Sequence, residues 1–383
     1  MSRCSIVGLL MLTLFSSRTM AQESCGAHMT PADIQRAWER YGPDRGPITP
    51  ISQDILVVTI AWHVLGRTTG EVAMTEDELQ AILDMLNNRW DPIDIEFKAH
   101  PVVDRIIDDE WYDQGVPDAN VFRAMRPMPN ALNIYWAPTL HNGLLCGIAG
   151  YSFSDLDSVA MQTTCFGDSD VSGIMSHEIG HWFDLFHTFE HALGLECVAR
   201  TNCSHAGDFC CDTPADFNTG FEACVNPDTC RLRHGECSEQ PGPCDDDPFY
   251  EPSTINFMSY IPTGCLKEFT SDQYDRMRYS LETFRPGYVN TGLHAPCPGD
   301  QNGDLLTDID DLLVIINGYG NCTGPCPSDL DGNGIVNVLD LLIVFDNWGS
   351  CFDCTDPFAC DDGDPNTIDY CWFGTCVHDL ESR

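Results

Sequence analysis

Residues 175–189 read MSHEIGHWFDLFHTF and hold three of the 12 histidines of the chain. His177 and His181 are four residues apart, so a helix brings both imidazoles to one face, about 6 Å apart along its axis. That spacing suits two ligands of a tetrahedral Zn²⁺ ion. Glu178, beside the first histidine, can hydrogen-bond a water on the metal instead of the metal itself. The stretch therefore predicts a zinc site on a helix that begins near Asp170 or Ser172.

The third histidine, His187, cannot reach the same ion from an unbroken helix, because it would lie about 15 Å along the axis from His177. The chain must turn back after His181. Asp184 is the predicted break, because helices often end on a left-handed residue, usually Gly, with Asn and Asp tolerated. Zinc on three imidazoles keeps an open position and lowers the pKa of a bound water to about 7. Glu178 is then expected to accept the proton of that water as a general base.

The pattern HExxHxxDxxH resembles the HExxHxxGxxH motif of the metzincin zinc peptidases, with Asp184 as the departure. Two more stretches, GDFCCDTPA at 207–215 and NFMSY at 256–260, are similar to the pappalysin-like (M43) peptidases. The resemblance covers roughly residues 25–285. It implies a two-lobed metzincin-type zincin domain that binds protein or peptide substrates between its lobes. It also implies that Met258 packs beneath the metal and that Tyr260 donates a hydrogen bond to the oxyanion.

The rest of this region reads as α+β, with strands and helices interleaved along one domain. β-Branched and aromatic runs predict strands at residues 51–64, 94–100, 130–138 and 147–154. Amphipathic spacing predicts helices at 74–90 and 270–285, the second with Thr270 or Ser271 at its N-cap. Residues 197–244 are rich in cysteine and poor in helix signals.

The charge is strongly negative, with 59 acids against 19 bases and a net charge of −40. Such a chain is not expected to bind nucleic acid or an anionic membrane surface. Residues 295–383, the acidic tail, hold seventeen Asp and Glu and a single Arg. This acidic excess suits calcium ligation or a salty exterior.

The N-terminus predicts secretion. An apolar run at residues 6–15 is too short to span a bilayer, and Thr19-Met20-Ala21 resembles a signal-peptidase site. Without Cys4 there remain twenty cysteines, twelve in residues 25–265 and eight in 297–376. Even numbers on both sides favour disulfides in an oxidising compartment. The expected location is extracellular.

The tail contains a repeat with a 29-residue offset, starting at Cys297 and Cys326. Each copy places oxygen ligands at positions 1, 3, 5, 7, 9 and 12 of a Ca²⁺ loop that runs into an apolar helix. The expected ligands are Asp300, Asn302, Asp304, the Leu306 carbonyl, Asp308 and Asp311, and then Asp329, Asp331, Asn333, the Ile335 carbonyl, Asn337 and Asp340. The pair resembles type I dockerin repeats, which implies a possible cohesin-like partner, although the repeats can also serve as a calcium-rigidified spacer. Leu305 replaces the glycine expected at position 6, which the second copy keeps as Gly334.

These patterns divide the chain into a signal peptide (1–21), a possible pro-segment (22–50), a metzincin catalytic domain (51–290), a dockerin-like repeat pair (295–351) and a cysteine-rich module (352–383). Within the possible pro-segment, Cys25 forms a disulfide or, as the resemblance implies, places its thiolate on zinc until cleavage near Arg40 or Arg45.

The leading hypothesis is a secreted zinc endopeptidase. The rival is an adhesion or scaffold protein with an inactive zincin domain, against which Glu178 argues. A third is a zinc hydrolase of non-peptide bonds. The family commonly favours a basic residue after the cut, but residues 261–264 carry no acid, so we expect a weaker preference here.

Overall fold

The computed structural model describes residues 29–43, 48, 51–52, 54–165, 171–217, 224–233, 242–244, 249–291, 299–302, 305–322, 326–331, 333–364 and 367–380, without the side chains of residues 171, 172 and 357. The predicted signal peptide, Cys25, Arg45 and Asp304 lie outside the described residues.

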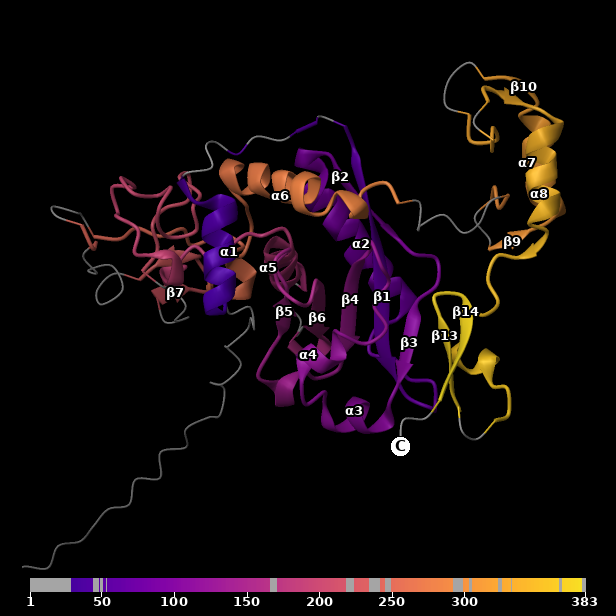
Figure 1. The fold of residues 1–383 in the computed structure, drawn as a ribbon. Coiled ribbons are helices and arrows are strands. Elements are labelled where there is room, and N and C mark those ends of the chain that lie inside the picture. The colour runs from indigo at the N-terminus through magenta and orange to yellow at the C-terminus, as the bar shows by residue number, and fades with distance from the viewer. Residues whose placement is uncertain are drawn as a thin grey trace, which may run out of the picture.

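A six-stranded sheet forms the centre of the molecule (Figure 1). Its order is β2-β1-β4-β6-β5, with β3 beside β1, and every pair is parallel except β5 with β6. The strands are β1 (Leu56–Gly66), β2 (Ile95–Ala99), β3 (Asp104–Ile107), β4 (Leu132–Ala137), β5 (Gly147–Ala149) and β6 (Ser158–Gln162). The four predicted strands are therefore present. β3 and β6 were not predicted, because they are short and their sequences show neither a long β-branched run nor a clear apolar–polar alternation.

Helices cover both faces of this sheet, so the fold is a mixed α/β one. On one face, α2 (Glu76–Trp90) and α5 (Val171–Trp182) pack against alternate residues of β1 such as Ile60 and Trp62. On the other face lie the short helices α3 (Asp109–Gln114) and α4 (Ala119–Phe122). The helix α6 (Ser271–Phe284) has Thr270 as its N-cap, as one of the two predicted alternatives had it.

The first helix, α1 (Pro31–Tyr41), falls within the segment predicted as a possible pro-segment. Ala37 and Tyr41 are buried in a cluster with Phe186, which follows α5, and α1 lies beside α6 in Figure 1. Arg36 donates to the Phe153 carbonyl at 2.8 Å. The helix thus packs against the domain that carries the histidine motif, and the domain boundaries themselves stay predictions.

Disulfide bonds cross-link both the histidine-bearing domain and the acidic tail, as expected from the cysteine count. The described bonds are Cys146–Cys165, Cys197–Cys244, Cys203–Cys211, Cys230–Cys265, Cys322–Cys326, Cys354–Cys371 and Cys360–Cys376. Cys210 is an exception to the predicted disulfides, because it is a buried free thiol. Burial raises the pKa of this thiol well above its ordinary value, so it behaves as a small apolar side chain. Two short strands, β7 (Val225–Asn226) and β8 (Arg231–Leu232), lie in this cysteine-rich region.

The acidic tail forms two helix-loop units and a hairpin. The units contain α7 (Ile309–Asn317) and α8 (Val338–Asp346), with the small strands β9 (Leu306–Thr307), β10 (Gly320–Asn321), β11 (Ile335–Val336) and β12 (Gly349–Ser350). The hairpin of β13 (Thr367–Trp372) and β14 (Thr375–Leu380) packs its turn residue Phe373 against Ala61 of β1 and against Met128. The described residues contain no helix with the length and apolar composition that a membrane crossing requires.

Candidate metal centre

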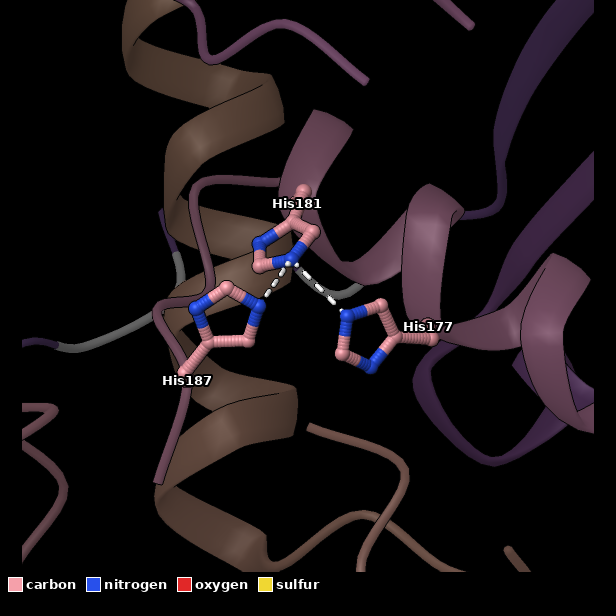
Figure 2. Close-up of side chains that lie close together, drawn as sticks. All are labelled: His177, His181 and His187. Carbon is pink, nitrogen blue, oxygen red and sulfur yellow. Dashed lines mark hydrogen bonds between the residues drawn. The ribbon is translucent and has the colours of Figure 1, made fainter. Parts of the chain in front are cut away.

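The three histidines of the motif converge on one point, from the end of α5 and the segment that follows it (Figure 2). His181 Nε2 lies 3.0 Å from His177 Nε2 and 3.1 Å from His187 Nε2. Zinc bonds of 2.0–2.1 Å at tetrahedral angles would hold such nitrogens about 3.3 Å apart. All three side chains are buried. The donor set and its spacing therefore fit one zinc ion.

The opposite ring nitrogens are engaged by the protein. Nδ1 of His177 lies 2.6 Å from the Phe257 carbonyl, and Nδ1 of His181 lies 2.8 Å from the Leu185 carbonyl. Because a carbonyl can only accept, each Nδ1 carries the proton and leaves the Nε2 lone pair for a metal. Burial lowers the pKa of His177 to about 4, which keeps this imidazole neutral at physiological pH.

The predicted break after His181 is present. Asp184 has φ +65°, the left-handed conformation. Its N–H donates to the His181 carbonyl at 2.8 Å, and the N–H of Leu185 donates to the Gly180 carbonyl at 2.9 Å. These are the two hydrogen bonds of a Schellman motif, which ends the helix and reverses the chain. The turn carries His187 back toward the first two histidines.

Glu178 is fully buried beside the histidines and lines a pocket of about 290 Å³. The edge strand β5 passes very close to it at Gly147. A Cβ atom at position 147 would lie 2.6 Å from Glu178 Cγ, so only glycine fits there without a shift. Glu178 thus lies at the wall of a pocket that it shares with His177.

The segment NFMSY places two further residues near the histidines. Met258 is fully buried, and a Cβ atom on Gly180 of α5 would meet its sulfur at 2.5 Å, so it packs directly against the ligand-bearing helix. The ring of Tyr260 lies 4.7 Å from that of His187 and 5.8 Å from that of His177, between centroids. Tyr260 also lines the pocket.

The pocket at Glu178 is mostly neutral. Its lining includes the apolar residues Ile174, Ile261 and Leu266 and the disulfide Cys146–Cys165. Among its described lining residues, Glu178 is the one acid. A larger cavity, about 570 Å³, lies between α1 and α6 near Asp272 and does not include the histidines.

The second predicted calcium loop brings its acids together. Carboxylate oxygens of Asp329, Asp331 and Asp340 lie within 4.8 Å of one another. Gly334 has φ +86° at the expected sharp turn, and its N–H donates to Asp329 at 2.7 Å. Asn337 caps α8, and its amide donates to the Ile335 carbonyl at 2.9 Å. Asn333, in the same loop, has an Oδ1 that accepts from the N–H of Ile335 at 2.9 Å.

The first loop has the same frame in its described residues. Asp311 is buried, and its Oδ1 accepts from the N–H of Gln301 and of Asn302 at 2.6 and 3.2 Å. Asp300 accepts from the N–H of Leu305 at 2.9 Å, and Asp308 caps α7. Leu305 takes φ +68°, so a leucine occupies the left-handed position where the second loop has glycine. Leu306 follows it at the start of β9.

Several residues of the centre were not predicted. Gly147, the Phe257 carbonyl and the pocket disulfide depend on contacts between segments far apart in sequence, which no local pattern reveals. Asp184 was predicted as a turn residue, but the partners of its carboxylate were not. The sequence did carry one signal for these partners. An acid stands where the motif usually has glycine, and its carboxylate needs hydrogen-bond donors if it is buried.

Comparison with known proteins finds a family model, relatives and a solved structure to which the chain is similar. The peptidase M43 family model, described as pregnancy-associated plasma protein-A, matches residues 132–282. An extracellular metalloprotease of Verticillium alfalfae is 32% identical over 253 residues, covering 60% of this chain and 80% of the relative. An extracellular metalloprotease of Colletotrichum graminicola is 27% identical over 296 residues, which cover 71% of this chain and 95% of the relative. The chain is also similar to a solved structure of mirolysin from Tannerella forsythia in complex with compound 9. The identity is 19% and the TM-score 0.44, and the match covers 62% of this chain and 96% of mirolysin.

Proposed function

Because the chain belongs to the M43 family of metallopeptidases, we propose that it is a secreted zinc endopeptidase that cleaves peptide bonds in protein substrates. The observation that carries the proposal is the convergence of three buried Nε2 atoms, 3.0 and 3.1 Å apart, beside a buried glutamate. The extracellular relatives and the disulfides support secretion.

His177, His181 and His187 would hold the zinc, which when bound acts as a Lewis acid and makes a water nucleophilic near neutral pH. Glu178 is placed to accept a proton at its carboxylate and to deliver it to the amine that leaves. The Tyr260 hydroxyl is the proposed donor to the developing oxyanion, for which one hydrogen bond is worth about 10²–10³ in rate. The Phe257 and Leu185 carbonyls hold two of the imidazoles in the ligating tautomer.

The neutral pocket beside Glu178 is the proposed binding site for the residue that follows the cleaved bond. β5 is the end strand of the sheet order and contacts Glu178 at Gly147. An extended peptide can pair its backbone with such a strand edge, which supports a polypeptide substrate over a small non-peptide one.

The tail repeats are proposed to bind two calcium ions. The second loop supports this most directly, because its three carboxylates approach one another within 4.8 Å despite their like charge. Calcium would rigidify the link between the catalytic part and the C-terminal hairpin. The dockerin resemblance extends the proposal to a cohesin-like partner.

The experiment that separates a peptidase from an inactive scaffold is an assay on casein and on a quenched-fluorescence peptide library. The purified secreted chain is tested as prepared, after treatment with a zinc chelator, and after zinc is restored. Cleavage that disappears with the chelator and returns with zinc supports the proposal. A chain that binds one zinc per molecule but cleaves no peptide in the library contradicts it and favours the scaffold.

A further inference from the structure

Asp184 stands where the family motif has glycine, and its carboxylate joins three separate segments of the chain. The side chain is fully buried. The Tyr41 hydroxyl of α1 donates to Oδ2 at 2.6 Å, and the Ser280 hydroxyl of α6 donates to Oδ2 at 2.8 Å. Ser152, in the loop after β5, donates its N–H to Oδ1 at 2.7 Å and its hydroxyl to Oδ2 at 2.5 Å. Four donors therefore fix the position of one carboxylate.

The charge of this buried group is also balanced. Guanidinium nitrogens of Arg40 and Arg285 lie 3.9 and 3.7 Å from its oxygens. A buried carboxylate costs free energy unless it is paired and hydrogen-bonded, and here it is both. The hydrogen-bond donors and the two guanidinium groups together stabilise the ionised carboxylate of Asp184.

The backbone of the same residue controls the ligands. The turn at Asp184 presents the Leu185 carbonyl to Nδ1 of His181 at 2.8 Å and then leads the chain to His187. A residue with a Cβ atom is less stable than glycine in the left-handed conformation. The contacts of the carboxylate offset that strain and tie the turn to the body of the domain.

We propose that Asp184 is a positioning residue of the zinc site, which holds the turn between the second and third histidines through Tyr41, Ser152 and Ser280. The inference rests on the proposed function, because it assumes that the three histidines bind zinc. Glycine at this position would relieve the backbone strain but leave the turn attached only by its own hydrogen bonds. A chain with the anchor should therefore retain zinc more tightly than one without it.

The test measures the zinc dissociation constant by competition with a chromophoric chelator, together with the melting temperature of the metal-free protein, for full-length variants. Asp184→Gly should weaken zinc binding at least tenfold, which is the effect typical of losing an outer contact of a metal site. Asp184→Asn keeps the size and tolerates the left-handed turn, so its loss should be intermediate. Ser280→Ala removes one donor and should weaken binding by a smaller factor.

The matched control is Asp104→Asn. Asp104, on strand β3, is also fully buried. Its carboxylate lies 2.7 Å from His63 and 3.4 Å from Arg126. This variant should lower the melting temperature while leaving the zinc dissociation constant unchanged, which distinguishes positioning from general stability.

Zinc binding by Asp184→Gly within twofold of the unmutated chain would overturn the inference and leave the proposed function intact. If the Asp184 variants do not fold, Ser280→Ala decides: reduced zinc affinity supports the anchor and unchanged affinity overturns it. Absence of zinc binding in the unmutated chain would instead refute the proposed function.

Discussion

At the scale of single residues, the chemistry of the centre depends on groups whose surroundings fix their protonation. Burial lowers the pKa of His177 to about 4 and keeps it neutral, and the Nδ1 atoms of His177 and His181 face backbone carbonyls. For one pair of buried acids, burial raises the pKa instead of lowering it. Glu196 and Asp208 are buried acids, and among the described residues no hydrogen-bond donor reaches either carboxylate oxygen of Glu196.

Burial, aided by the neighbouring Asp208, raises the pKa of Glu196 to about 8, and burial raises that of Asp208 to about 7. In the unfolded chain both acids ionise near pH 4. The folded state thus binds more protons between these limits, so the free energy of unfolding falls as the pH rises toward 8. We expect the melting temperature of the metal-free protein to drop between pH 6.5 and 8.5. In Glu196→Gln the drop should be smaller by several degrees, whereas Glu76→Gln, on the surface, should match the unmutated chain.

The residue after the cut is predicted to be selected without a strong charge preference. Glu178 is the one acid among the described residues that line the neutral pocket, and no acid occurs at 261–264. Sequencing of products from a peptide library should show cleavage before several residue types. Almost exclusive cleavage before Arg would refute this. Thr263→Asp, which adds an acid to the pocket wall, should raise the preference for Arg by about tenfold, the effect of about 1.4 kcal/mol.

At the scale of elements, the sequence was informative wherever a local pattern dominates. The capping box at Thr270, the long strand β1 and the left-handed break at Asp184 follow from short-range chemistry and were all predictable. The strands β3 and β6, the glycine at 147 and the donors around Asp184 depend on tertiary contacts. These contacts join separate segments of the chain, such as Ser152 with Asp184 and Tyr41 with Asp184, so no local periodicity predicts them.

The calcium loops give a prediction at this scale. Both loops need a left-handed residue at the turn, and Leu305 carries a Cβ strain that Gly334 avoids. The second loop should therefore bind calcium more tightly, and addition of calcium should protect the tail against proteolysis. In the full-length chain, Asp329→Ala should remove the tighter of two binding events seen by calorimetry, and Asp300→Ala the weaker. The reverse order would contradict the argument.

At the scale of the whole molecule, the part that carries the histidine motif contacts both α1 and the C-terminal hairpin. The helix α1 is buried against it at Ala37 and Tyr41, and the C-terminal hairpin packs on it through Phe373. The acidic repeats lie between the catalytic part and that hairpin in sequence. Modules that read as separate in the sequence are thus in contact in the fold.

Latency is a prediction at this scale. Cys25 is outside the described residues, and the free thiol Cys210 already departs from full pairing. A thiolate from Cys25 on zinc would displace water and silence the secreted chain. The switch predicts that Cys25→Ser is active at once, whereas the unmutated chain needs its N-terminus trimmed. Equal activity of both chains on secretion would assign Cys25 to a disulfide instead.

The central claim is that three histidines bind the zinc while Glu178 acts on the substrate as a base, and one paired measurement tests it most directly. Zinc content and peptidase activity are determined together for Glu178→Ala and His187→Ala. Glu178→Ala should keep one zinc per chain and lose more than 99% of its activity, as expected for loss of a general base. His187→Ala should lose both zinc and activity. Activity of Glu178→Ala above about a hundredth of the unmutated value, or full zinc content in His187→Ala, would contradict the account.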